Sequence, residues 1–143
     1  MMANALVPEL TVSDWQHSKQ FYCDILGFHC EYERVEEGFC YLKLGDAELM
    51  IDQLGVGRTF EDGHQPVQYP FGRGLNIQIQ VADLNVILSS LIKNDIPFFL
   101  PVEERWYRVN DCESGNRQLV VADPDGYLLR FFQDLGVRSV PHA

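Results

Sequence analysis

Basic residues are scarce in this sequence. Eleven Lys and Arg stand against 21 Asp and Glu, which gives a formal net charge of −10 at pH 7. Nucleic acids and anionic membranes are bound through basic patches, and the sequence offers no evident one. We therefore expect no nucleic acid and no membrane as a partner. The acidic balance has two interpretations, a surface that is merely soluble or a groove that attracts a cationic ligand, and charge alone does not separate them.

Long apolar runs and cysteine motifs are missing as well. No run approaches the roughly 20 apolar residues that a membrane span needs, and the first residues lack the basic region of a signal peptide, so we expect a cytoplasmic protein. The sequence has no G-x-S-x-G nucleophile elbow and no C-x-x-C pair. In the cytoplasm the cysteines are expected to be small buried thiols rather than disulfides. They are Cys23, Cys30, Cys40 and Cys112.

The elements that are present follow the same order twice. Residues 6–12 alternate as a strand, Ser13 and Gln16 have the spacing of a capping box, and a helix is predicted from about Asp14 to Leu26, before Gly27. Strands are predicted at 28–35, 38–44 and 47–53. In the second half the prediction is a strand at 75–81, a helix from 83 to about 94, and strands at 97–100, weakly at 105–109, at 117–122 and at 127–133. The predicted fold class is therefore α+β, with two βαβββ modules in a single domain of residues 1–143.

Between the two modules lies a segment without a clear period. Module one covers about 5–53, the connecting loop 54–73, and module two about 74–134. At about twenty residues the loop is longer than ordinary connections, so it is either a linker or a lid over a site. The sequence leaves both interpretations open.

Strand alternation assigns the side chains of each module to two faces. One face is apolar and is expected to pack on the helices. The other face either meets water or lines a cleft. Its predicted polar members are Glu9, Thr11, Glu48, Asp52, Asn76, Gln78, Gln80 and Arg130. Aromatic candidates are Phe39 and Tyr41 on the same side, with Phe60, Tyr69, Phe71, Trp106 and Tyr107 in segments of no clear period.

Two motifs resemble a known family. They are the opening Val7-Pro8-Glu9-Leu10-Thr11-Val12-Ser13-Asp14, followed by Phe21-Tyr22 and Leu26-Gly27-Phe28, and the closing Asp123-Pro124-Asp125-Gly126 with Arg130. Together they are similar to the vicinal-oxygen-chelate superfamily, the glyoxalase/bleomycin resistance protein family, and within it to the bleomycin-resistance branch. The resemblance implies curved mixed sheets around a cleft and a domain-swapped homodimer.

The resemblance also bears on metal binding. Metal-dependent members of the family carry His or Glu at four slots, which correspond here to Val7, Met50, Asn76 and Arg130. Val and Met cannot hold a hard divalent metal, Asn is a poor ligand for one, and Arg would repel it. We therefore expect no metal, no other cofactor and no catalytic residue.

The function implied by the resemblance is sequestration of a cationic antibiotic of the bleomycin class. The alternative is a glyoxalase- or dioxygenase-type lyase or isomerase of the same fold, and a third reading is a ligand-sensing module. Relatives often place Trp-Gly before the penultimate strand, where this chain has Glu113-Ser114-Gly115, and Trp106 is a candidate substitute. The candidate ligand-binding residues are Glu9, Phe39, Tyr41, Glu48, Asp52, Phe60, Asn76, Gln78, Trp106, Tyr107 and Arg130.

Overall fold

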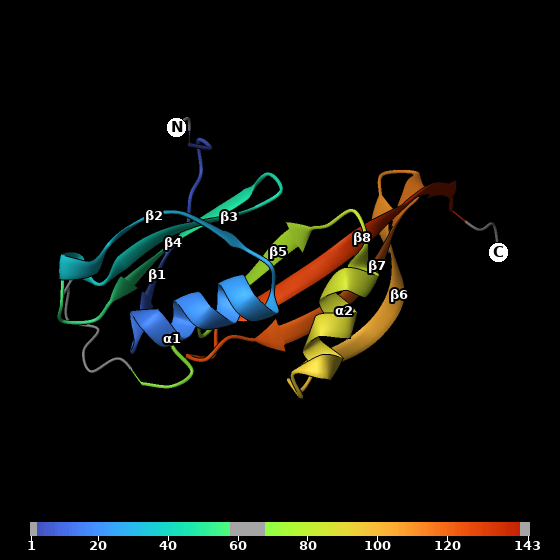
Figure 1. The fold of residues 1–143 in the computed structure, drawn as a ribbon. Helices are drawn as coiled ribbons and strands as arrows, with labels where there is room; N and C mark the ends of the chain where they lie inside the picture. Colours follow the sequence, from blue (N-terminus) through green and yellow to red (C-terminus); the bar gives the residue numbers. More distant parts are fainter. Residues whose placement is uncertain (1–2, 58–67, 141–143) are drawn as a thin grey trace. The chain divides into compact units, whose positions relative to one another are not determined.

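The computed structural model describes residues 3–57 and 68–140, and Figure 1 shows their fold. The chain divides into two compact units. The first unit contains the residues up to Leu75 together with Asp123–Tyr127. The second contains Asn76–Ala122 and the residues from Leu128 onward. Among the described helices, none is long and apolar enough to cross a membrane.

The first unit consists of one mixed sheet and one helix (Figure 1). The strands lie in the order β1 (Glu9–Val12), β4 (Ala47–Gln53), β3 (Phe39–Leu44) and β2 (His29–Arg34). β1 runs parallel to β4, whereas the other neighbours are antiparallel. The helix α1 (Trp15–Gln20) continues into a π-helical stretch, η1 (Phe21–Ile25), and a short 3-10 turn, η2 (Val35–Glu37), connects β2 to β3.

Asp14, and not a capping box, begins α1. The Asp14 carboxylate accepts hydrogen bonds from the backbone N–H groups of Gln16 and His17, which otherwise have no partner in the first turn. The predicted Ser13 cap was wrong, because the Ser13 hydroxyl and backbone N–H both donate to Asp125 instead. The helical segment ends before Gly27, whose φ of +86° suits glycine, as predicted.

The core of the first unit lies on the side of the sheet that faces α1. Leu10, Val12, Leu49 and Ile51 are at most 3% exposed, and α1 packs on β3 and β4. Burial alternates along β1 as predicted, whereas in β4 the polar residues Glu48 and Asp52 are buried as well as Leu49 and Ile51. On the opposite side of the same sheet, Phe39, Tyr41, Glu48 and Asp52 are also at most 6% exposed.

The second unit repeats this arrangement. Its strands lie in the order β5 (Asn76–Gln80), β8 (Leu128–Ser139), β7 (Cys112–Ala122) and β6 (Leu100–Val109), and only β5 and β8 are parallel. The helix α2 (Leu84–Lys93) is capped by Asp83 and contacts β8. Two four-stranded mixed sheets with one helix each confirm the predicted α+β fold class. The buried residues of this unit include Ile79, Leu84, Ile87, Leu91, Leu119, Val121, Leu129 and Phe131.

The last three strands are longer than the sequence predicted. β6 runs without a break from Leu100 to Val109, where two short strands at 97–100 and 105–109 were predicted. β7 begins at Cys112 and not at 117, and β8 continues to Ser139. Asn110, at a φ of +58°, makes the tight turn between β6 and β7, because Asn tolerates the left-handed region. A register shift between Leu100 and Glu103 breaks the alternation at the start of β6, which hides the strand from pattern reading.

The turn Asp123–Tyr127 belongs to the first unit, although it connects β7 to β8. The Tyr22 hydroxyl donates to the Asp123 carboxylate at 2.7 Å, and the Tyr127 hydroxyl donates to the Thr11 carbonyl at 2.8 Å. Burial raises the pKa of Asp123 to about 6, against the opposing effect of hydrogen bonds from the Tyr22 hydroxyl and from the backbone N–H groups of Asp125 and Tyr127. The predicted tight turn is present, and its side chains are buried hydrogen-bonding groups.

Candidate functional site

The face of the first sheet that points away from α1 gathers most of the predicted site residues of this unit. The strand register places them in two rows that run across the sheet. One row consists of Glu9, Met50, Tyr41 and Tyr32, and the other of Thr11, Asp52, Phe39 and Arg34.

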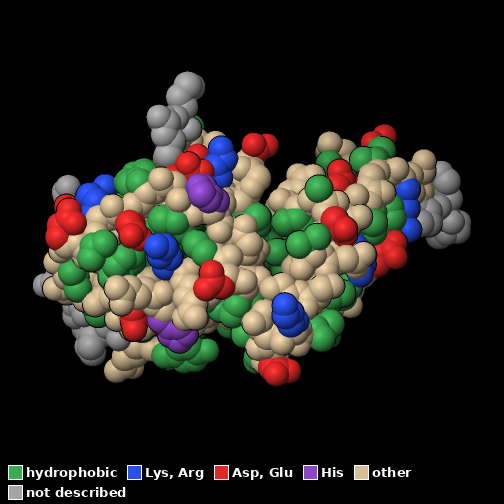
Figure 2. Space-filling view, viewed as in Figure 1, with side chains coloured by type: hydrophobic (Ala, Val, Ile, Leu, Met, Phe, Trp, Pro, Cys, Tyr) green, Lys and Arg blue, Asp and Glu red, His purple; other side chains and the backbone are tan. Residues whose placement is uncertain are grey.

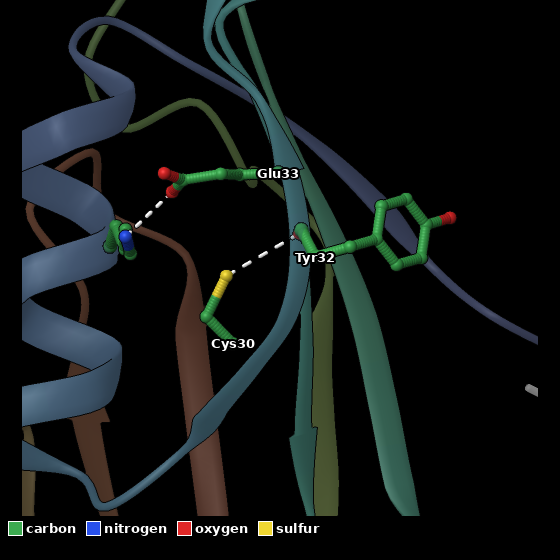
Figure 3. A network of polar contacts seen from close by, with 4 residues as sticks. Cys30, Tyr32 and Glu33 are labelled. Carbon is green, nitrogen blue, oxygen red and sulfur yellow. Dashed lines mark hydrogen bonds and ion pairs between the residues drawn. The ribbon is translucent and has the colours of Figure 1, made fainter.

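Three rings on this face form an aromatic platform, defined as Tyr32, Phe39 and Tyr41. The Tyr32 and Tyr41 rings are stacked, with centroids 5.2 Å apart and planes 17° apart. Phe39 lies 5.9 Å from Tyr32. Figure 3 shows the Tyr32 ring on the side of β2 away from α1, while Cys30 and Glu33 point toward the helix. Tyr32 is 42% exposed, so the platform presents one open ring for stacking.

The aromatic platform already holds a cation. The Arg34 guanidinium lies 4.0 Å from the centroid of Phe39 and 5.8 Å from that of Tyr32. Its Nε donates to Glu37 at 2.6 Å. A guanidinium at this distance from a ring face is a cation–π contact. The face therefore has the chemistry to attract positive charge.

Two buried carboxyls lie beside the aromatic platform. Glu48 accepts hydrogen bonds from the Tyr41 hydroxyl at 3.2 Å and from the Asn4 backbone N–H at 2.6 Å. Burial, followed by the negative charges of Glu9 and Glu37, raises the pKa of Asp52 to about 6. Burial and the hydrogen bond to Glu48 also raise the pKa of Tyr41. Asp52 thus titrates close to neutral pH, whereas an ordinary carboxyl does not.

The corresponding face of the second sheet carries a hydrogen-bonded cluster. The Gln118 amide donates to Glu103 at 2.9 Å and to the Tyr107 hydroxyl at 2.7 Å. Arg130 donates to the same hydroxyl at 3.5 Å. Sequence reasoning missed Glu103 and Gln118. Gln118 alternates with buried Leu119 and could have been found from that pattern, but the shifted register of β6 conceals Glu103.

The remaining candidates lie apart from these contacts. Asn76 and Gln78 are exposed on β5, and Gln78 is the cross-strand neighbour of Arg130. Trp106 follows alternation to the side opposite Tyr107, where its ring covers Gly115 and lies under the Arg138 guanidinium at 4.0 Å. Phe60 lies outside the described residues.

Charges of both signs are spread over the surface. In the face of the molecule drawn in Figure 2, Lys and Arg side chains are interspersed with Asp and Glu side chains. The ion pairs of the described residues include Lys19–Glu33, at 2.6 Å, and Arg138–Glu113, at 3.0 Å. Such exposed pairs contribute little to stability, so the carboxyls beside the aromatic platform are the more informative charges.

Comparisons with known proteins place the chain in a family. The model of the Glyoxalase/Bleomycin resistance protein/Dioxygenase superfamily matches residues 4–131. The chain belongs to this superfamily. A superfamily member from Vibrio splendidus 12B01 is 32% identical over 90% of this chain and 97% of that chain, with a TM-score of 0.41. The comparison with curated proteins found no match.

Two more distant solved structures share the fold. TioX from Micromonospora sp. ML1 is 18% identical, with a TM-score of 0.72, over 93% of this chain and 100% of that chain. A lactoylglutathione lyase from Agrobacterium tumefaciens is 15% identical, with a TM-score of 0.55, over 92% of this chain and 96% of that chain. Identities this low support the superfamily fold and leave the activity open.

The residues that the family resemblance assigns to metal slots do not suit a metal ion. Met50 lies between Glu9 and Tyr41 in its row, and Arg130 is a cation bonded to Tyr107. Neither a thioether nor a guanidinium replaces a carboxylate or imidazole toward a hard divalent ion, and the other two slots hold Val7 and Asn76. Within residues 3–57 and 68–140, no group of three or more His, Cys, Asp or Glu could hold a metal ion.

Proposed function

We propose that this superfamily member is a cytoplasmic, metal-free binding protein that sequesters a cationic antibiotic of the bleomycin class. The observation that carries the proposal is the Arg34 guanidinium over the Phe39 ring, on the same face as the buried Asp52. It is a cation–π contact within the protein, of the kind that a ligand cation would make with the same rings. An exposed Tyr32 ring beside it offers a stacking surface for a flat heterocycle.

The charges on this face favour a cation over an anion. Glu9, Glu48 and Asp52 share this face with Lys43, which lies opposite Glu48, and Arg34 is already paired with Glu37. At an effective dielectric near 20 and roughly 8 Å, each carboxylate contributes at most about 2 kcal/mol to a ligand cation, and less after salt screening. Such fields speed encounter and orient a ligand.

Calorimetric titration with metal-free bleomycin in the presence of EDTA tests the proposal. We expect saturable binding that weakens as salt is added, and elemental analysis of the purified protein without stoichiometric Zn, Mn, Ni or Fe. Binding that requires an added metal, or no heat of binding at micromolar protein, would remove the proposal.

A second candidate function rests on Asp52. A buried carboxyl with a pKa of about 6 can serve as a general base near neutral pH, so a lyase or isomerase of the glyoxalase type is the alternative. It predicts turnover of the hemithioacetal of methylglyoxal and glutathione that is lost in Asp52→Asn. If the protein binds bleomycin and does not turn over the hemithioacetal, the sequestration function is favoured.

A further inference from the structure

Two buried polar atoms in the hydrogen-bonded cluster of the second unit have no hydrogen-bond partner among the described residues. Gln118 is 2% exposed, and its Oε1 is buried without a hydrogen-bond partner, as is the Nε of Arg130. One atom is an acceptor and the other a donor. Gln118 is paired with Phe132 and Arg130 with Val120, so the two side chains are diagonal neighbours on one face of the sheet.

The orientation of the Gln118 amide is fixed by its neighbours. A carboxylate accepts hydrogen bonds and does not donate them, so the amide nitrogen must face Glu103, to which it lies at 2.9 Å. Its second N–H is used by the Tyr107 hydroxyl. The Oε1 atom is therefore held on the remaining side of the amide and cannot be exchanged with the nitrogen by a simple flip.

Leaving both atoms unpaired is costly. A buried polar group without a partner costs about 1–3 kcal/mol, and native proteins retain few of them without a ligand, a water or a catalytic reason. Arg130 is only partly buried, and its one described hydrogen bond, to Tyr107, is 3.5 Å long. Both atoms are buried, so a guest can reach them only when the Arg130 guanidinium turns aside.

The charges and the donor pattern select the guest. A carboxylate brings acceptors alone and would place an oxygen against the Gln118 Oε1, close to the negative Glu103. An ammonium brings donors alone and would lie against Arg130. A neutral carboxamide supplies one acceptor and one donor side by side, and the formal charges of Arg130 and Glu103 already offset each other.

We propose that this face of the second unit binds a carboxamide group, whose carbonyl accepts from the Arg130 Nε and whose N–H donates to the Gln118 Oε1. This inference rests on the proposed binding function. It adds that the sequestered molecule carries a carboxamide group as well as a cation. Tyr107 and Glu103 act as positioning residues, since they hold the Gln118 amide in its orientation.

Titration of the full chain with benzamide, followed in 15N–1H correlation spectra, tests the carboxamide site. We expect saturable shifts of the Gln118 side-chain N–H₂ and Arg130 Nε–H signals. Acetophenone, which only accepts, and benzoate, which is anionic, should bind at least about fivefold more weakly, the equivalent of about one hydrogen bond.

Three variants complete the test. Gln118→Met and Arg130→Lys should each weaken benzamide binding at least about fivefold; Lys keeps the charge but lacks the secondary N–H of Arg. Gln16→Met, at an exposed position of α1, is the matched control and should bind as the wild type does. If Gln118→Met does not fold, Arg130→Lys carries the comparison alone.

The outcomes are distinct for the two proposals. No benzamide shift, equal binding of the three probes, or unchanged affinity in Arg130→Lys would overturn the carboxamide site and leave a bridging water as the partner of the two atoms. Bleomycin calorimetry on the wild type decides the proposed function separately. A protein that binds benzamide and not bleomycin retains the carboxamide site and loses the antibiotic as its ligand.

Discussion

At the scale of single residues, the carboxyl of Asp52 makes cation binding depend on pH. Its pKa of about 6 means that the negative charge beside the aromatic platform is largely absent at pH 5 and largely present at pH 7. We expect affinity for a cationic ligand such as bleomycin to rise across this interval. Calorimetry at pH 5, 6 and 7 in the wild type and Asp52→Asn measures it, and the variant should lose most of the rise.

The matched double variant Glu48→Gln, Asp52→Asn removes two charges and keeps the side-chain size. It should bind a cationic ligand at least about tenfold more weakly at pH 7 and with a shallower salt dependence. Both side chains lie away from the α1-facing core, so circular dichroism should show a retained fold. Unchanged affinity and salt slope would mean that the acidic balance of the chain is only a solvated surface.

The buried carboxyl of Asp123 should make the protein less stable as the pH rises, whereas a carboxyl with a lowered pKa has the opposite effect. Because its folded pKa is raised to about 6, the native state holds the proton more tightly than the unfolded chain does. Its stabilising contribution is fully present below about pH 4 and is lost as pH rises through 6, by up to about 2–3 kcal/mol. Urea unfolding at pH 4.5 and pH 7 should show a smaller fall in Asp123→Asn than in the wild type. The exposed control Asp24→Asn should keep the full fall.

At the scale of elements, the β6–β7 hairpin depends on the absence of a side chain at Gly115. A Cβ added there would lie 2.7 Å from the Trp106 ring, which is itself covered by Arg138. Gly115→Ala should therefore destabilise the protein by about 1–3 kcal/mol in urea unfolding, and Trp106→Leu in the same chain should recover part of the loss. Ser114→Ala, which adds no atom, is the control; a Gly115→Ala variant within about 0.5 kcal/mol of wild type would show that the ring moves freely.

The strands of the first unit show what the sequence could and could not predict. The alternation of β1 and β4 correctly predicted that Glu9, Glu48 and Asp52 share a face, because nothing interrupts the period of two in those strands. Tyr32 and Arg34 were missed because β2 carries a register shift between Cys30 and Tyr32. A bulge moves every later side chain to the other face, and it depends on tertiary pairing that a single sequence does not display.

At the scale of the whole molecule, the repeated βαβββ order is the feature that the sequence predicted best. Both halves start with a strand and an Asp-capped helix, and local signals of this kind do not depend on distant contacts. The assignment of the Asp123–Tyr127 turn to the first unit could not be predicted, since it depends on hydrogen bonds with Tyr22 and Thr11, about a hundred positions away in the sequence.

Assembly is the last property to be tested, and we expect a homodimer. Among the described residues, each sheet ends in two edge strands, β1 and β2 in the first unit and β5 and β6 in the second. Open edges favour pairing with another chain. The second unit also exposes large apolar side chains near the far end of its longest strands, with Val109 at 53% and Val137 at 72%. Sedimentation equilibrium at micromolar concentration should give twice the chain mass of 16.4 kDa.

The double variant Val109→Lys, Val137→Lys should shift the population toward the monomer if this end of the sheet is in the interface. Val86→Lys, at an exposed position of α2, is the control and should not shift it. A wild-type species of the single-chain mass would contradict the homodimer, and a dimer unaffected by the paired variant would move the interface to the strand edges.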